Sequence, residues 1–199
     1  MRISRREFLK FLFEGAFIVG FLRFLSLPKG RVKAEIVRPP GAVEEECFNQ
    51  LCVRCGVCIE ICPTGTIVPV GPGANVNAVN TPRIDPLSGP CEFVRGLCED
   101  ERLCYKFCPT GALRDVNKNE IKIGTVEFDS SLCLAFQGKE CLVCYEMCPV
   151  PSAITVSEDL KPIFNGDLCV GCGTCVYHCP AEPKALILRS EGEKRAPCP

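Results

Sequence analysis

The sequence predicts an α+β protein made of two similar halves, and two observations point to this fold class. Four cysteine motifs recur along the chain, each ending in Cys-Pro, and a short apolar run follows each of them. A unit of short strand, cysteine loop and short helix that is used four times is typical of a domain built by repetition. The 199 residues are enough for one or two small domains.

The fourth motif has the most regular spacing. Its cysteines are Cys169, Cys172, Cys175 and Cys179, separated by two, two and three residues, and Pro180 follows. Bacterial ferredoxins hold a 4Fe-4S cluster with this spacing, and the fourth cysteine ligates the other cluster in proteins with two clusters. The glycines between the ligands suit the tight turn, because they reach positive φ at little cost. The motif therefore predicts a cluster site and a partner motif.

The other three motifs extend this pattern to sixteen cysteines. The first motif has the spacing of the fourth, whereas the cysteines of the second are separated by six, five and three residues and those of the third by seven, two and three. The sequence therefore predicts four 4Fe-4S clusters in two ferredoxin-like halves. The predicted cluster and iron ligands are Cys52, Cys55, Cys58, Cys62, Cys91, Cys98, Cys104, Cys108, Cys133, Cys141, Cys144, Cys148, Cys169, Cys172, Cys175 and Cys179.

Spacing does not decide which motifs are partners. Adjacent pairing joins the first with the second and the third with the fourth, whereas nested pairing joins the first with the fourth and the second with the third. We favour nested pairing, because it makes partners of the two regular motifs and of the two irregular ones. The wide gap after Cys91 leaves a second question open, since a cysteine out of reach would leave three ligands and a three-iron cluster.

Disulfides and zinc are the alternatives to iron. An even number of cysteines in an oxidising compartment usually indicates disulfides, but disulfides need neither the C-x2-C-x2-C run nor a proline after each last cysteine. Zinc sites with four cysteines usually come as two separated pairs. Cys47 and Cys198 lie outside the motifs, and their simplest interpretation is unpaired surface thiols. The alternative is a disulfide between them, which nested pairing would allow by placing the first and fourth units in one half.

The order of these features predicts a signal or anchor helix in residues 1–34, a linker in residues 35–46 and a four-cluster domain in residues 47–199. Within that domain the repeats lie near residues 52–63, 91–109, 133–149 and 169–180. Short apolar or alternating runs predict strands around the motifs. These runs lie at residues 64–68, 83–85, 121–128, 153–156, 161–164 and 185–188.

Residues 1–34 combine a basic head with an apolar run. Residues 4–10 read S-R-R-E-F-L-K and resemble the twin-arginine (Tat) export signal at every fixed position. Tat carries folded proteins, so we expect the protein in the periplasm or on the outer face of the cytoplasmic membrane. Residues 8–27 approach the roughly 20 residues that span a bilayer, yet they contain three charged side chains, and no strict A-x-A cleavage site follows. Cleavage and an uncleaved anchor both remain open.

The charge of the chain is uneven. Lys and Arg number 23 and Asp and Glu 24, but residues 1–34 hold eight basic and two acidic side chains, so the remainder has 15 basic and 22 acidic, a balance of −7. An acidic body argues against nucleic acid and for protein partners. The chain has one His, no nucleotide-binding glycine fingerprint and no Ser/His/Asp constellation. We therefore expect no catalytic residue, and an electron-transfer component rather than an enzyme by itself.

The third motif carries the most specific likeness to a known family. Residues 133–150 combine the seven-two-three spacing with a C-x-x-C-Y-x-x-C-P-V ending, and residues 90–91 and 98–100 are similar to parts of the same family's second motif. On these residues the chain resembles the NapG/MauM family of ferredoxin-type proteins. The resemblance implies Tat export, four 4Fe-4S clusters and a role in periplasmic nitrate reduction or methylamine oxidation. The chain departs from the family in its wider second motif and in the two cysteines outside the motifs.

The predicted function is electron transfer through four 4Fe-4S clusters. By resemblance, electrons pass from a membrane quinol-oxidising protein to a periplasmic oxidoreductase. Two alternatives remain: an electron-transfer subunit of a molybdopterin oxidoreductase, and a maturation or structural factor whose clusters only hold the fold together. Reduction of the clusters by a quinol, in membranes that contain the partner, separates electron transfer from the structural role.

Overall fold

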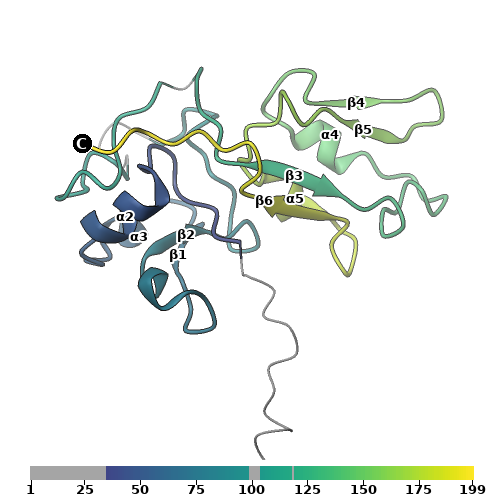
Figure 1. Cartoon of the computed structure of the whole chain (residues 1–199). Helices are drawn as coiled ribbons and strands as arrows, with labels where there is room; N and C mark the ends of the chain where they lie inside the picture. Colours follow the sequence, from purple (N-terminus) through teal and green to yellow (C-terminus); the bar gives the residue numbers. More distant parts are fainter. Residues whose placement is uncertain (1–34, 99–103, 118) are drawn as a thin grey trace, which may run out of the picture. The chain divides into compact units, whose positions relative to one another are not determined.

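Short strands and helices of one or two turns make up the body of the protein in the computed structural model, which describes residues 35–98, 104–117 and 119–199 (Figure 1). The predicted export signal and the possible membrane span at residues 8–27 lie outside these ranges. Within them, no helix is long and apolar enough to cross a membrane. The elements in chain order are α2 (Glu45–Leu51), α3 (Val57–Glu60), β1 (Ile67–Pro69), η1 (Val76–Ala78), β2 (Pro82–Ile84), β3 (Thr125–Phe128), α4 (Val143–Met147), β4 (Ile154–Val156), β5 (Pro162–Phe164), α5 (Thr174–His178) and β6 (Leu186–Arg189).

Three antiparallel strand pairs organise this part of the chain. β1 pairs with β2 and β4 pairs with β5, so each of these hairpins joins the end of one cysteine motif to the start of the next. β3 and β6 pair along four residues, from Thr125 opposite Arg189 to Phe128 opposite Leu186. Residues 125–189 therefore run β3–α4–β4–β5–α5–β6, with the outer strands in contact. All six predicted strands are confirmed, with bounds shifted by a few residues.

In the half that holds the first two motifs, a single β-bridge takes the place that the β3–β6 pair has in the other half. Ala42 forms this antiparallel bridge with Leu113. The first, third and fourth motifs carry the predicted short helices α3, α4 and α5, but the second motif forms turns at residues 104–107. Residues 42–113 thus enclose two motifs, as residues 125–189 enclose the other two.

The segment predicted to be a linker, residues 35–46, is largely packed into the body instead. Arg38 is only 1% exposed, and its guanidinium lies 4.4 Å from the centre of the Phe48 ring. The guanidinium donates to Glu45 Oε1 at 2.6 Å and to the Pro82 carbonyl oxygen at 2.8 Å. A buried charge is tolerated when it is paired and hydrogen-bonded in this way. Arg38 therefore fixes α2 against the start of β2.

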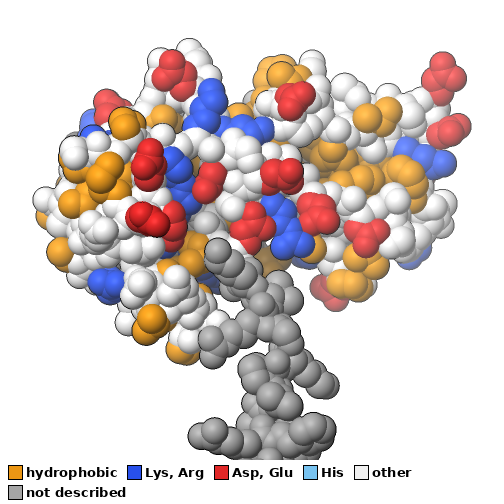
Figure 2. Space-filling view, in the orientation of Figure 1, with side chains coloured by type: hydrophobic (Ala, Val, Ile, Leu, Met, Phe, Trp, Pro, Cys, Tyr) orange, Lys and Arg blue, Asp and Glu red, His pale blue; other side chains and the backbone are white. Residues whose placement is uncertain are grey.

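One hydrophobic cluster includes residues of both halves. It contains Ile67 and Ile84 of the first hairpin together with Ile154 and Leu186 of the other half, and several motif cysteines belong to it. Because the cysteine motifs are part of the core, a group that they bind contributes directly to folding. On the face shown in Figure 2, Asp and Glu side chains stand close to Lys and Arg side chains and do not form a large region of one sign.

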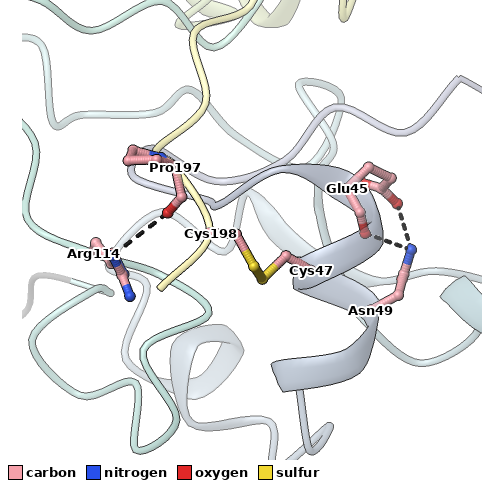
Figure 3. Close-up of a disulfide and its surroundings, with 6 residues drawn as sticks. All are labelled: Glu45, Cys47, Asn49, Arg114, Pro197 and Cys198. Atoms are coloured by element: carbon pink, nitrogen blue, oxygen red, sulfur yellow. Dashed lines mark hydrogen bonds between the residues drawn. A yellow bond between two sulfur atoms is a disulfide. The ribbon is translucent and has the colours of Figure 1, made fainter.

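The carboxyl-terminal segment returns to the first half, where a disulfide fixes it (Figure 3). Cys198 bonds to Cys47 on α2, with their Cα atoms 5.9 Å apart, and Ala196 forms a parallel bridge with Val43. The prediction of two unpaired thiols is wrong, and the alternative disulfide is confirmed. Cys198 reaches Cys47 in a different way from the one that nested pairing would provide. The first and fourth units are not in one half; instead, residues 190–199 cross from the half with the last two motifs to the half with the first two.

We predict that unreduced protein, unfolded anaerobically after iron removal, contains sixteen thiols that react with an alkylating reagent, because Cys47 and Cys198 are bonded to each other. Reduction before labelling should raise the number to eighteen. In a Cys198→Ala control, Cys47 becomes free and seventeen thiols should react with or without reduction. Mass spectrometry of the labelled protein gives each number, and eighteen labels on the unreduced natural chain would contradict the disulfide.

Candidate iron-sulfur sites

Three cysteines of the fourth motif surround a hollow together with one cysteine of the third. Cys169, Cys172 and Cys175 line a space of about 430 Å³, a volume that includes its open mouth, and Cys148, directly after α4, lines the same space. Side chains from β3, β4 and β5 complete the wall. We name this set of four cysteines site C.

A second hollow repeats this arrangement in the first half. Cys52, Cys55 and Cys58 of the first motif line a space of about 410 Å³ together with Cys108, the last cysteine of the second motif. In both hollows the helix that carries the third cysteine begins after a glycine in the left-handed conformation. We name this set site A. Sites A and C each take three cysteines from one motif and the fourth from its neighbour.

A third set combines the remaining cysteines of the first two motifs. Burial, followed by the nearby thiols of Cys58, Cys62 and Cys98, raises the pKa of Cys104 to about 12. Burial also raises the pKa of Cys91, and Cys104 and Cys98 add to this effect. The wide gap in the second motif therefore keeps Cys91 beside the other cysteines. We name the set of Cys62, Cys91, Cys98 and Cys104 site B.

The fourth set lies where α4 and α5 are in contact. Burial, followed by the thiols of Cys133, Cys141 and Cys179, raises the pKa of Cys144 to about 12. Cys133, Cys141 and Cys144 come from the third motif, and Cys179 follows α5 in the fourth. We name this set site D.

The structure thus brings the sixteen predicted ligands together in four sets of four, and adjacent motifs are the partners. Nested pairing, which the similar spacing of the first and fourth motifs favours, is wrong. The physical reason lies in the hairpins β1–β2 and β4–β5, which return the chain directly from one motif to the next. Spacing within a motif describes how one loop curves, and it does not identify the motif that lies beside it.

The electrostatics of these sets fit a bound metal cluster. Burial raises the pKa of the Cys58 thiol to about 12 and that of Cys175 further still, and neighbouring thiols add to both shifts. Four thiolates this close together need a metal to neutralise them, and a thiol that coordinates a metal is deprotonated outright. The irons of a 4Fe-4S cluster bind four thiolates in this way. In the ranges that the structure describes, no three His, Cys, Asp or Glu side chains are placed to share a single metal ion.

Threonine hydroxyls beside the sulfurs are a feature that the cysteine spacing does not reveal. Thr64 Oγ1 lies 3.6 Å from Cys62 Sγ, and Thr110 Oγ1 lies 3.7 Å from Cys108 Sγ. Burial would raise the pKa of Cys108, but hydrogen bonds from the Leu113 N–H and from Thr110 outweigh burial, so the pKa lies below its usual value. The signal that could have found these residues is Cys-Pro-Thr, which ends the first and second motifs. Hydrogen bonds to sulfur tune the potential of an iron-sulfur cluster.

The fold and the cysteine sets together define a class of protein: a small iron-sulfur protein of the ferredoxin type, in which paired motifs exchange one cysteine. The 4Fe-4S binding domain family matches residues 49–68 and 162–183, which contain the first and fourth motifs.

Relatives narrow this class to one family. The ferredoxin-type protein NapG of Escherichia coli (strain K12) is 35% identical, and the match covers 92% of this chain and 84% of that protein. The methylamine utilization ferredoxin-type protein MauM of Methylobacillus flagellatus is 32% identical over 86% of this chain and 76% of its own length. The MauM of Paracoccus denitrificans is 33% identical over 83% and 79%. The chain therefore belongs to the NapG/MauM family of ferredoxin-type proteins, as its third motif predicts, and its function is iron-sulfur electron transfer.

Gly171 provides a test of how closely site C is packed. A Cβ on this residue would lie 2.5 Å from the Gly124 backbone nitrogen, and the φ of Gly171 is +74°. Gly56, before α3 at site A, is the matched control, because its φ is +79° but nothing lies within 4 Å of an added Cβ. We expect Gly171→Ala to lose iron from site C, whereas Gly56→Ala should cost only the about 1–2 kcal/mol of the left-handed conformation. Iron and acid-labile sulfide per chain, measured after anaerobic purification, compare the two variants, and equal iron contents would contradict the close packing.

Proposed function

We propose that this chain carries electrons through four 4Fe-4S clusters, one at each of sites A to D, with each half acting as a ferredoxin-like module. The observation that supports this proposal is the arrangement of sixteen cysteines in four sets, each with three from one motif and the fourth from the adjacent motif. When bound, a 4Fe-4S cluster supplies a one-electron redox centre. The residues of the chain supply the thiolates, exclude water from the buried sulfurs and donate hydrogen bonds to them.

The four sites lie in one series. The Cys58 thiol of site A adds to the effect of burial in raising the pKa of Cys104 in site B, so these two sites are neighbours. The Cys91 N–H of site B donates to the Cys172 carbonyl oxygen of site C at 2.8 Å, across the boundary between the halves. The contact between α4 and α5 brings sites C and D together. The series A–B–C–D therefore offers electrons a path with sites A and D at its ends.

Both ends of the series carry exposed apolar side chains against which a partner protein can pack. At site A, Cys55 is exposed, and Val53 is 60% exposed. At site D, Tyr145 beside Cys144 is 47% exposed, and Phe136 is 43% exposed. We propose that electrons enter and leave at these ends. The partners implied by the family resemblance are a membrane quinol-oxidising protein and a periplasmic oxidoreductase.

We also propose that the Tat motif in residues 4–10 exports the protein to the periplasm or to the outer face of the cytoplasmic membrane, with residues 1–34 as the signal or anchor. The disulfide between Cys47 and Cys198 supports this location, because disulfides persist in oxidising compartments such as the periplasm. Methylamine utilization, named in the MauM relatives, and nitrate reduction, implied by the family resemblance, are the two candidate pathways.

The number of clusters follows from iron analysis. Four clusters predict about sixteen irons and about sixteen acid-labile sulfides per chain in anaerobically purified protein. Cys91→Ala leaves three ligands at site B, so we expect it to lose iron and to give the EPR signal of a three-iron cluster. Cys198→Ala, a cysteine outside the four sites, is the control and should keep the full iron content. A natural chain with about twelve irons or fewer would contradict the proposal, and fifteen would place a three-iron cluster in it.

Reduction by a quinol tests the proposed source of electrons. Membranes of the source cells, supplied anaerobically with a quinol, should bleach the visible absorption of the cluster-loaded protein, because the membrane partner passes electrons to it. Lipid vesicles that contain the same quinol but no protein serve as the control and should leave the absorption unchanged. Protein that holds its full iron content and stays oxidised in the membranes would overturn the quinol route and favour a maturation or structural role.

A further inference from the structure

Arg95 joins the two halves where sites B and C meet. It lies within residues 92–97, the wide gap between the first two cysteines of the second motif. Its Nη2 donates to the Met147 carbonyl oxygen at 2.8 Å. Met147 is the last residue of α4 and directly precedes Cys148 of site C. A cation from one half is therefore placed beside a cysteine of the other half.

The loop that carries Arg95 is fixed by its own motif. Phe93 is 4% exposed, and its ring lies 6.3 Å from the ring of Tyr105, centre to centre, in an edge-on arrangement. The Gly96 N–H donates to the Phe93 carbonyl oxygen at 3.1 Å and closes a turn around Arg95. The buried ring and the turn hold Arg95 in place, so the position of its guanidinium depends on how the second motif is folded.

The charge of Arg95 stands next to site C. Its guanidinium is hydrogen-bonded to the residue directly before Cys148, and the Cys91 N–H at the start of the same motif donates to the Cys172 carbonyl oxygen, so the second motif lies against two cysteines of site C. Glu92 Oε1 lies 3.8 Å from Arg95 Nη1 and offsets part of the positive charge. A cation that stabilises a thiolate also stabilises the more negative, reduced state of a cluster on the same sulfurs, because nearby charge shifts the potential.

We propose that Arg95 raises the reduction potential of the cluster bound at site C. The proposal rests on the function proposed above, in which site C holds a 4Fe-4S cluster. Reduction there is the gain of one electron, and no bond to Arg95 forms or breaks. An electron that comes from site B is held more favourably at site C than it would be without the arginine. Because Arg95 belongs to the motif of site B, the fold of one half adjusts the potential in the other.

The test compares variants of the full, cluster-loaded chain by redox titration followed with EPR. Arg95→Gln removes the charge but keeps a side-chain donor for the Met147 carbonyl oxygen, and Arg95→Lys keeps the charge. The control is Arg189→Gln, which removes an arginine of β6 that pairs with Glu127 at 2.7 Å and so also has a carboxylate partner.

In Arg95→Gln we expect one of the four potentials to fall, with an equilibrium constant for reduction lowered by up to about tenfold, which is about 59 mV for a one-electron couple. Arg95→Lys should restore most of the difference. High salt should reduce it, because the Arg95 side chain is 29% exposed and its charge is screened by ions. In Arg189→Gln, each of the four potentials should change by less than the fall expected in Arg95→Gln.

Potentials in Arg95→Gln that match those of the Arg189→Gln control would overturn the proposal. Loss of iron from Arg95→Gln, but not from Arg189→Gln, would also overturn the proposal. The contact of Arg95 with Met147 would then hold the site together and not adjust its potential. Titration of the natural chain separates these results from a failure of the proposed function: a natural chain without four reducible clusters overturns the four-cluster function and this inference with it.

Discussion

The exchange of one cysteine between adjacent motifs is the constraint on which the rest of the structure depends. Each site contains four sulfurs, and one motif supplies three of them. The fourth comes from the last cysteine of the neighbouring motif, which follows a short helix or turn and precedes a proline. For that cysteine to reach its site, the chain must return at once, and the hairpins β1–β2 and β4–β5 provide this return.

Cross-links explain how so little regular structure forms a folded body. The strands have three or four residues and the α-helices four to seven, so each element buries little by itself. In small domains metal ligation supplies folding free energy that a thin core does not. Motif cysteines and the hairpin residues Ile67 and Ile154 share one hydrophobic cluster, so the loss of one of these cysteines also removes packing. The disulfide adds one more cross-link by tying the end of the chain to α2.

Features that depend on a few neighbouring residues could be predicted better than features that depend on contacts between distant parts of the chain. The six strands and the family could be predicted, because alternation and motif spacing are properties of a few neighbouring residues. The pairing of motifs could not, since it depends on where the hairpins send the chain. The same holds for Arg38, placed in a predicted linker, whose partner Pro82 lies 44 residues away. The sequence offered the disulfide only as an alternative, and that alternative assumed nested pairing, which is wrong. No local pattern indicates the parallel bridge of Val43 with Ala196, which brings the end of the chain back to the first half.

Net charge is a poor guide to the cluster potentials, because cations stand beside particular sulfurs. Residues 35–199 carry a balance of −7, which would lower every potential. Yet burial raises the pKa of Cys52 at site A, and a backbone hydrogen bond from Arg54, then the charges of Arg38 and Arg54, oppose this rise. Arg54 stands where the fourth motif has Gly171, takes a φ of +58° and donates to the Val79 carbonyl oxygen at 3.0 Å. The two cations near site A therefore belong to its own half, whereas site C receives Arg95 from the other half. Halves with the same strand and cysteine pattern thus differ in local charge. Under the proposed function, this difference would give the clusters of the series unequal potentials.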